Sequence, residues 1–354
     1  MSNPRKLRSR KAGLPPGSLV HIGEIKTARP SITVIDFGPD KLHEATLAEI
    51  SELRDYHRQN DVLWINLYGV HEPHILAAVG EMFGLHPLVL EDILNTDQRQ
   101  KVDRYDNYLY VVLHRYMLAA GALDLAQDQI SVVVGRNLVL TFQERQSKTF
   151  EPVRQRLRAE HSKLRRGAAD SLAYSLIDSV VDSYFGVIEQ LNERAEVLEE
   201  EILGKPRPAA LEGIHELKRC VSRLRRNLYP LREVVGSLYR DAGDFFTTEI
   251  QLYLRDVYDH AVHILESLED LRDLATGLLD VYLSTVSHRV NLELRTLTVV
   301  ATIFMPATLL AGIFGMNFKV MPWLDQPAGF SYVLGLMGAI AVFMLALFWR
   351  RRFV

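Results

Sequence analysis

Hydrophobic and polar positions change their pattern twice along this chain of 354 residues. Between residues 18 and 144, β-branched and aromatic runs alternate with helical stretches such as "HEPHILAAVGEMFGL" and "HPLVLEDIL". Runs of the first kind predict strands, and apolar positions at steps of three and four predict helices. The runs that we expect to be strands are "SLVHIG", "SITVIDFG", "VLWINLYG", "YLYVVLHRYML" and "QISVVVGRNLVLTF". The alternation predicts an α/β domain over residues 1–148, with a mixed sheet and helices packed on it.

Beyond Lys148 the strand pattern gives way to long helices rich in Glu, Arg and Leu. Breaks at "GKPRP" and "DAGD" predict a long-helix hairpin region over residues 149–244. We expect a stalk segment over residues 245–315, and within it the helical pattern runs from Thr247 to about Phe314 with only Pro306 to interrupt it. These 68 residues, at about 1.5 Å each, predict one helix of roughly 100 Å.

Two long segments near the C-terminus carry no charge. They cover residues 296–318 and 326–349, which are 23 and 24 residues. Either is long enough to cross a bilayer, because about 20 apolar helical residues span its hydrocarbon core. We therefore expect transmembrane helices at about 296–314 and at 329–349, joined by an outer loop at 315–328.

Charge near the chain ends predicts the orientation of these spans. The arginines of the basic tail 350–354 favour the cytoplasmic side and can also anchor lipid headgroups. The basic segment "MSNPRKLRSRKAG" is followed by no apolar run, so we expect neither a secretory signal nor an anchor there. A protein of the inner (cytoplasmic) membrane with two spans and both termini in the cytoplasm is the consistent topology.

Composition excludes several other functions. A formal net charge of −3 gives no general attraction for nucleic acid. The single cysteine, Cys220, excludes intrachain disulfides and cysteine-rich metal sites.

One face of the expected stalk helix is small or polar over much of its length. Steps of three and four place the following residues on that face: Asp280, Ser284, Ser287, Asn291, Leu294, Thr298, Ala301, Met305, Thr308 and Gly312. Small residues allow close helix–helix packing in a membrane, so a packing seam is one interpretation. The other is the wall of a pore, which requires a ring of identical chains because two spans cannot enclose water.

The segment "FGMNF" joins the two spans and offers a site for a cation. Gly315 permits the first span to end, and the Asn317 amide oxygen then follows the negative end of the helix dipole. A ring of about five such oxygens around an axis can hold the water shell of an ion. This suits Mg²⁺, which dehydrates reluctantly. By spacing alone, a structural turn is the more common cause of such a motif.

With that motif and segments along nearly the whole chain, the sequence resembles the CorA family of divalent-cation channels. The other matching segments are "GLPPGSLV", "HPLVLEDILN", "SLIDSVVDSYF", "YPLREV", "SLYRD", "RDVYDH", "GLLDVYLS" and "ATIFMP". The resemblance implies a homopentameric funnel that conducts Mg²⁺, and also Co²⁺, with Gly315, Met316 and Asn317 as the selectivity filter.

Further site residues follow from the same resemblance. Asn291 and Thr308 offer oxygens to the pore, Leu294, Leu297 and Met305 form dry constrictions, and Asp280 attracts cations below the membrane. For Asp280, a merely solvated helix face is the alternative.

Two positions depart from the family's usual pattern. Phe314 stands where a tyrosine is usual, so a hydroxyl is missing before the motif. Trp323 stands where the outer loop often carries glutamate, and Asp325 is the nearest acid that can replace it.

Carboxylates in the soluble part are candidates for regulatory Mg²⁺ sites. Asp256, Asp259 and His260 share a helix face, which is suitable for joint cation binding, although solvated faces often carry such patterns. By the resemblance, Asp92 and Asp256 share an ion between subunits, and Glu91 and Asp178 belong to a second site. Bound Mg²⁺ would bridge repelling carboxylates and hold the channel closed, and its loss would open the channel.

Three other functions compete with that of a Mg²⁺ channel. An enzyme is disfavoured, because the histidines of "HEPH" are three residues apart instead of four and no Gly-rich phosphate loop is present, so we expect no nucleotide. A membrane-anchored coiled-coil scaffold explains the helices but not the polar face. A Zn²⁺ or Co²⁺ transporter of the same superfamily is the alternative within the channel class.

Overall fold

The computed structural model describes residues 13–119, 123–204, 206–241, 243–316, 323 and 326–350. The chain forms two compact units. The first comprises residues 1–198 and 212–276, and the second comprises residues 199–211 and 277–354. Each unit is described by itself below.

A seven-stranded mixed sheet forms the centre of the first unit, with the strand order β2-β1-β3-β7-β6-β5-β4. Neighbouring strands are antiparallel except for β3 and β7, which run parallel. The strands are β1 (Ser31–Phe37), β2 (Leu42–Leu47), β3 (Val62–Tyr68), β4 (Lys101–Arg104), β5 (Tyr108–Leu118), β6 (Leu125–Gly135) and β7 (Leu138–Gln143). The prediction of a mixed sheet with helices is confirmed.

The prediction of a strand at "SLVHIG" is wrong, because only Ile22 makes a bridge there, to Asn95. The run "QISVVVGRNLVLTF" is two strands instead of one, since a turn between Gly135 and Leu138 reverses the chain. Strands β2 and β4 were not expected from the sequence. Both lie at the edges of the sheet, where half-exposed strands lack the apolar pattern that marks a buried one.

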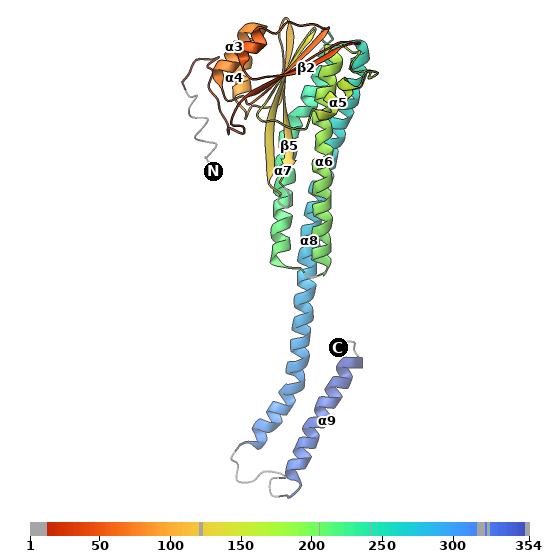
Figure 1. Cartoon of the computed structure of the whole chain (residues 1–354). Helices are drawn as coiled ribbons and strands as arrows, with labels where there is room; N and C mark the ends of the chain where they lie inside the picture. The colour runs from red at the N-terminus through yellow and green to blue at the C-terminus, as the bar shows by residue number, and fades with distance from the viewer. Residues whose placement is uncertain are drawn as a thin grey trace. The chain divides into compact units, whose positions relative to one another are not determined.

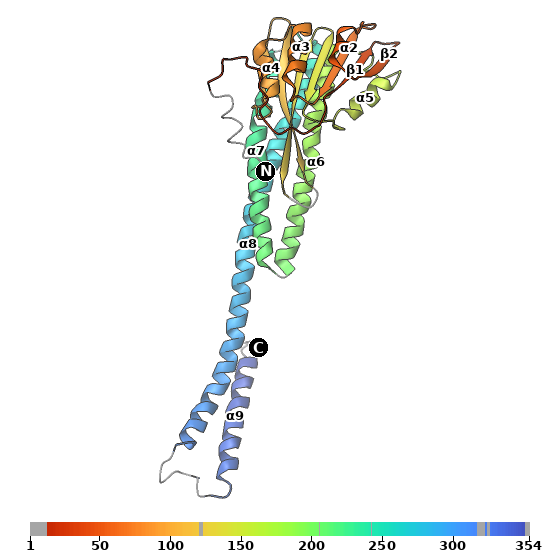
Figure 2. The same ribbon diagram turned by 60° about the vertical axis from the view of Figure 1, so that its left-hand side comes forward.

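Three helices cover one face of this sheet, two of them labelled in Figure 1 and all three in Figure 2. They are α2 (Ile50–Arg54), α3 (Pro73–Phe83) and α4 (Pro87–Leu94). Gly80 allows α3 to approach α4, because a Cβ atom there would lie only 2.5 Å from Cδ1 of Leu90. Both α3 and α4 begin with proline, whose fixed φ suits the first helical turn, and the two predicted helices are confirmed.

The opposite face packs against α5 (Glu151–Arg158) and α6 (Ala169–Gly204). Trp64 of β3 meets the Phe150 ring at 6.0 Å and donates a hydrogen bond to Thr141 Oγ1. Tyr184 of α6 donates its hydroxyl hydrogen to the backbone oxygen of His114 in β5. These contacts fix α6 relative to the sheet, and α6 carries part of the candidate site.

Two further long helices follow, α7 (Pro208–Asp241) and α8 (Thr248–Phe314). The predicted breaks at "GKPRP" and "DAGD" are confirmed, and α8 is the single long helix expected, with Pro306 inside it. Within the first unit, the rings of Tyr174 in α6 and Tyr253 in α8 are 5.3 Å apart. The two helices are therefore packed together where the candidate site lies.

The second unit contains residues 277–314 of α8 and helix α9 (Gly329–Arg350), together with the segment 199–211. Both α8 and α9 contain a window long and apolar enough to cross a membrane. In the single chain, only 6% of the α8 window and none of the α9 window is buried. Exposed apolar helices of this length need a lipid or protein environment to cover them.

Candidate divalent-cation site and membrane helices

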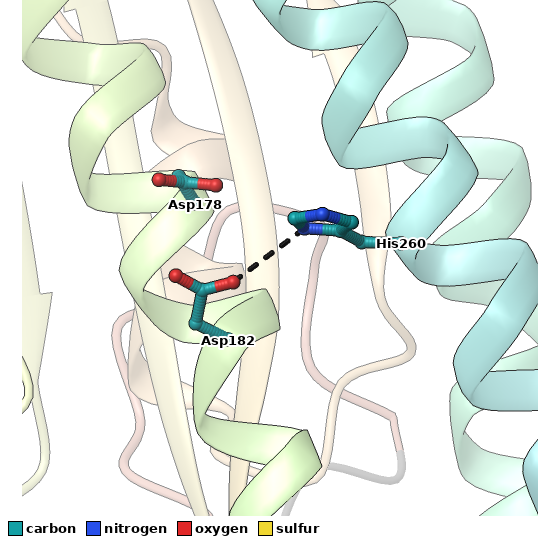
Figure 3. Close-up of side chains that lie close together, drawn as sticks. All are labelled: Asp178, Asp182 and His260. Atoms are coloured by element: carbon teal, nitrogen blue, oxygen red, sulfur yellow. Dashed lines mark ion pairs between the residues drawn. The ribbon is translucent and has the colours of Figure 1, made fainter.

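Two carboxylates of α6 and one imidazole of α8 converge in the first unit. Asp178 and Asp182 are four residues apart, so they lie one turn apart on the same face of α6. Figure 3 shows both side chains directed toward His260 of α8. One ligand atom from each of the three lies within 4.8 Å of the others, which is close enough for joint metal coordination.

His260 also connects this group to the next carboxylate along α8. Its Nδ1 atom is 3.5 Å from Oδ1 of Asp182, and its Nε2 atom is 3.8 Å from Oδ2 of Asp256. The Nδ1 atom is buried and forms no hydrogen bond of normal geometry with the described residues. The imidazole thus stands between carboxylates from two helices.

The site concentrates negative charge. Burial and the neighbouring Asp182 carboxylate raise the pKa of Asp178 to about 6, although His260 and Arg156 oppose the shift. Burial and the Asp178 and Asp256 charges likewise raise the pKa of Tyr174 to about 12. A divalent cation would offset the repulsion between carboxylates that, after burial, contributes to both shifts.

The donor set decides which cations fit. Carboxylate oxygens are the ligands that Mg²⁺ prefers. An imidazole nitrogen adds affinity for transition metals such as Co²⁺, Ni²⁺ and Zn²⁺. The group can therefore take either kind of divalent ion.

The predicted residues Glu91 and Asp92 lie on α4 instead. Asp92 Oδ2 is 2.7 Å from Lys101 Nζ, and its Oδ1 accepts a hydrogen bond from Gln98 Nε2 at 2.7 Å. Burial raises the pKa of Asp92, while Lys101 acts in the opposite direction. Glu91 accepts a hydrogen bond from the Gly17 backbone nitrogen.

The structure therefore brings Asp178 and Asp256 together around His260, and it places Glu91 and Asp92 in a separate group on α4. Sharing of an ion between Asp92 and Asp256 of neighbouring subunits stays a prediction. Sequence reasoning missed Asp182, and the signal that was available is its spacing of four from Asp178. Asp259, expected beside Asp256 and His260, is exposed.

The candidate pore residues of the second unit are exposed in the single chain. They are Asp280, Asn291, Leu294, Leu297, Met305 and Thr308. Thr308 Oγ1 donates to the Phe304 carbonyl at 2.9 Å, so its lone pairs remain free to accept a hydrogen bond from water. Part of this face forms a shallow groove that runs from Ala301 to Met316.

The helix ends where the sequence predicted. Gly315 N donates to the Ala311 oxygen at 2.9 Å and closes the last turn of α8 after Phe314. A Cβ atom on residue 315 would lie 3.1 Å from that oxygen, so glycine is the residue that leaves it least crowded. Met316 is described and exposed, whereas Asn317, Asp325 and the arginines at 351 and 352 lie outside the described residues.

The mixed α/β unit and the two long apolar helices define a membrane protein, and Asp178, Asp182 and His260 form a candidate site for a divalent cation. The family model for "CorA-like Mg2+ transporter protein" matches residues 59–352. The chain belongs to this family, and the resemblance inferred from the motifs is confirmed.

Curated relatives agree with the family model. The chain is 42% identical over 349 residues to the cobalt/magnesium transport protein CorA of Thermotoga maritima, covering 99% of each chain. It is 32% identical over 285 residues to the putative metal ion transporter YfjQ of Bacillus subtilis, covering 80% of this chain and 88% of the relative.

A solved structure supports the fold. The complete CorA magnesium transporter of Methanocaldococcus jannaschii matches with a TM-score of 0.73 at 22% identity. The match covers 90% of this chain and 97% of the other. Long helices that follow an α/β unit are thus an arrangement this chain has in common with that transporter.

Proposed function

We propose that this protein is a Mg²⁺ channel that admits Mg²⁺, and also Co²⁺, across the cytoplasmic membrane. The observation that carries the proposal is the 42% identity, over 99% of both chains, to a protein named for cobalt and magnesium transport. The relatives are named transporters, which agrees with a role other than that of an enzyme.

We propose a homopentamer because one chain cannot enclose a path for ions. Leu294 and Met305 are 54% and 69% exposed, and polar Asn291 and Thr308 lie exposed on the same helix. Copies of α8 around an axis would cover this face and present its oxygens to water. The apolar members would form the narrow dry constrictions. A helix–helix seam would also cover the face, and the oligomeric state distinguishes the two.

Selectivity is proposed to arise at Gly315, Met316 and Asn317. The end of α8 at Phe314 supports this, because the helix dipole then directs its negative end toward that segment. A ring of Asn317 amide oxygens would hold the water shell of the ion. A hydrated ion of high charge density such as Mg²⁺ suits this arrangement.

Gating is proposed to depend on internal Mg²⁺ at the carboxylates of the first unit. Asp92 and Asp256 would share one ion across a subunit interface, and Glu91 and Asp178 would contribute to a second. The raised pKa of both Asp92 and Asp178 supports this, since each carboxylate lies where negative charge is costly. An ion bound there would hold subunits together, and its loss would let them separate.

Entry needs no nucleotide hydrolysis in this proposal. An inside-negative potential contributes about 2.3 kcal/mol per charge per 100 mV, or roughly 4.6 kcal/mol for a divalent cation. The proposed topology places both termini in the cytoplasm, with the basic tail near lipid headgroups. The membrane potential alone can then drive influx.

Flux into liposomes tests the proposal. Purified protein should carry Mg²⁺ when the interior is free of Mg²⁺ and should be blocked when internal Mg²⁺ is high. Asn317→Ala should abolish selective flux, and Asp256→Lys should relieve the internal block. A stable monomer, or the absence of divalent flux at every voltage, would contradict the proposal.

A transition metal as the main cargo is the second candidate. The presence of His260 favours a transition metal, because its imidazole lies within reach of Asp178 and Asp182. Co²⁺ and Zn²⁺ commonly bind imidazole, whereas Mg²⁺ does not need it. Competition between Mg²⁺, Co²⁺ and Zn²⁺ in the same liposomes decides between the two.

A further inference from the structure

A polar cavity of about 690 Å³ lies in the first unit, away from the carboxylate–imidazole group. Its wall comes from the loop 97–100, from β5, from Gln127 of β6 and from the middle of α7, with one residue of α8. Residues of five separate chain segments thus line a space that is large enough for a small organic ligand.

Positive charge dominates the wall of the cavity. Four arginines line it, Arg99, Arg225, Arg226 and Arg272, against the single acid Asp97. Guanidinium groups present several N–H donors in a plane and bind phosphate oxygens in pairs. Four of them around one cavity is an arrangement suited to an anion that carries several oxygens.

The ion pairs within the protein leave part of the positive charge of these arginines available for a ligand. Arg99 contacts Glu233 at 3.2 Å, and Arg225 shares Glu269 with Arg272. Arg226 is exposed and forms no ion pair with any residue that the structure describes. Its guanidinium group is therefore free to bind a ligand in the cavity.

Two buried side chains on the wall have polar atoms without a partner. His114 is 5% exposed and Gln100 is 3% exposed, yet His114 Nε2 and Gln100 Oε1 form no hydrogen bond of normal geometry within the described ranges. Burial lowers the pKa of His114 to about 4, so its ring is neutral. The Tyr116 hydroxyl is 3.3 Å from His114 Nδ1.

These atoms have hydrogen-bonding capacity that a ligand can use, and the Gln129 side chain also lies within reach of His114. When the Tyr116 hydroxyl donates to Nδ1, the Nε2 atom carries the ring hydrogen and needs an acceptor. Buried polar groups normally find a partner in the protein or in bound molecules, because leaving them unpaired is costly. An anion oxygen would satisfy Nε2, and a hydroxyl group would satisfy the Gln100 oxygen.

We propose that this cavity binds a small phosphorylated organic molecule, with its phosphate groups on Arg226, Arg225 and Arg99. The volume exceeds what an inorganic phosphate needs, and the rings of Tyr116 and Tyr229 supply surface for an organic part. A nucleoside polyphosphate has the required charge, hydroxyl groups and flat base. The missing Gly-rich loop does not conflict with this, because side-chain guanidinium groups replace backbone N–H groups as phosphate ligands.

Calorimetric titration of the full-length protein in detergent tests the proposal. The probes are ATP, ADP and inorganic phosphate, each in buffer with EDTA so that metal binding makes no contribution. Saturable binding of ATP, tighter than that of phosphate, is the expected result. Binding of phosphate but not of ATP would overturn the organic part of the proposal, and binding of neither below about 10 mM would overturn it entirely.

Matched variants locate the binding. Arg226→Gln should weaken ATP binding about ten-fold, since charged hydrogen bonds to phosphate contribute most of such affinity. Arg219→Gln is the control, because Arg219 lies two turns earlier on the same face of α7 and does not line the cavity. Equal affinities for the two variants would overturn the assignment of the site.

A measurement on the buried side chain gives an independent check. His114→Gln keeps a neutral polar group near the orphaned position. ATP should raise the melting temperature of the unmodified protein more than that of this variant. An equal rise in both would contradict a role for His114, and Arg226→Gln still tests the site if His114→Gln does not fold.

Discussion

The Nδ1 atom of His260 lies 3.5 Å from Oδ1 of Asp182, across the space between α8 and α6. Asp178 is one helical turn from Asp182, and Asp256 is one turn from His260. Three carboxylates and an imidazole therefore lie close together at this place. Repulsion between the carboxylates makes the place a candidate for a response to divalent cations.

Replacement of the imidazole is expected to change metal preference. His260→Ala removes the only nitrogen ligand of the group, so stabilisation by Co²⁺ should fall while stabilisation by Mg²⁺ changes little. The melting temperature of the full-length protein, measured at increasing Co²⁺ or Mg²⁺, checks this. His263→Ala is the control, because His263 also contacts Phe185 but is not a member of the group. Equal losses for both metals would show that His260 acts only in packing.

The raised pKa of Asp178 predicts a stability that depends on pH. A carboxyl group with a higher pKa in the folded state binds its proton more tightly there, so its contribution is complete at low pH. That contribution is lost as the pH rises from about 4, the unfolded value, through about 6. In EDTA at pH 7.5, Asp178→Asn should therefore raise the melting temperature by about 1–3 °C, a figure reduced for partial exposure.

The same variant should have the opposite effect when Mg²⁺ is present, because it removes one charge from the proposed metal site. At pH 4 in EDTA the two proteins should melt together. Glu189→Gln, an exposed change on the same helix, should leave both comparisons unchanged. A higher melting temperature for Asp178→Asn at every pH would attribute the effect to packing instead of charge.

Lys101 is expected to weaken the regulatory binding of Mg²⁺ by Asp92. Its Nζ atom lies 2.7 Å from Asp92 and 2.5 Å from Asp103, so an incoming ion must compete with a resident cation. Lys101→Met should lower the internal Mg²⁺ concentration that blocks flux by about five-fold, which corresponds to about 1 kcal/mol for a partly exposed pair. Flux into liposomes at graded internal Mg²⁺ measures this.

A suitable control is Lys41→Met, which removes an exposed lysine at the turn between β1 and β2. An unchanged blocking concentration in Lys101→Met would mean that Asp92 does not bind the regulatory ion.

Much of the fold follows from periodicity in the sequence. Buried β3 and β5 and the long α8 were predictable, because a fully apolar strand and a long unbroken helical pattern are strong signals. The edge strands β2 and β4 were not, since their side chains are mostly only partly buried or exposed and the strands therefore lack an apolar run, although each pairs with a strand that is its neighbour in the sequence.

The site was predictable only within a single helix. Spacing placed Asp256 and His260 on one helix face. The contact between Asp182 of α6 and His260 of α8 could not be predicted from the sequence. The ion pair between Lys101 and Asp92 could not be predicted either, because the position of Lys101 depends on the pairing of β4 with β5. Contacts between elements require the tertiary packing, and the resemblance to a family gave residues but not these partners.

A buried carboxylate of β6, held by three cations, supports the sheet. Asp128 of β6 has a side chain only 6% exposed, and its carboxylate contacts Lys26 at 3.0 Å and both Arg115 and Arg145 at 2.9 Å. Burial alone would raise its pKa, but Arg145 and Lys26 outweigh that effect and hold the pKa of Asp128 below its ordinary value. The carboxylate thus contributes stability above pH 3.8, and the contribution is lost as the pH falls through the lower folded value.

Asp128→Asn removes one negative charge and leaves the three cations with the Glu144 carboxylate, which lies 2.9 Å from Lys26 Nζ. The remaining excess of positive charge should cost the first unit about 3 kcal/mol of local stability. Amide hydrogen exchange of β6 and β7 at neutral pH should then be roughly 100-fold faster. Asp106→Asn, in the exposed turn between β4 and β5, should leave the exchange rates unchanged. Unchanged exchange in Asp128→Asn would mean that hydrogen bonding to an uncharged amide is sufficient, and that the desolvation of the carboxylate offsets the attraction of its cations.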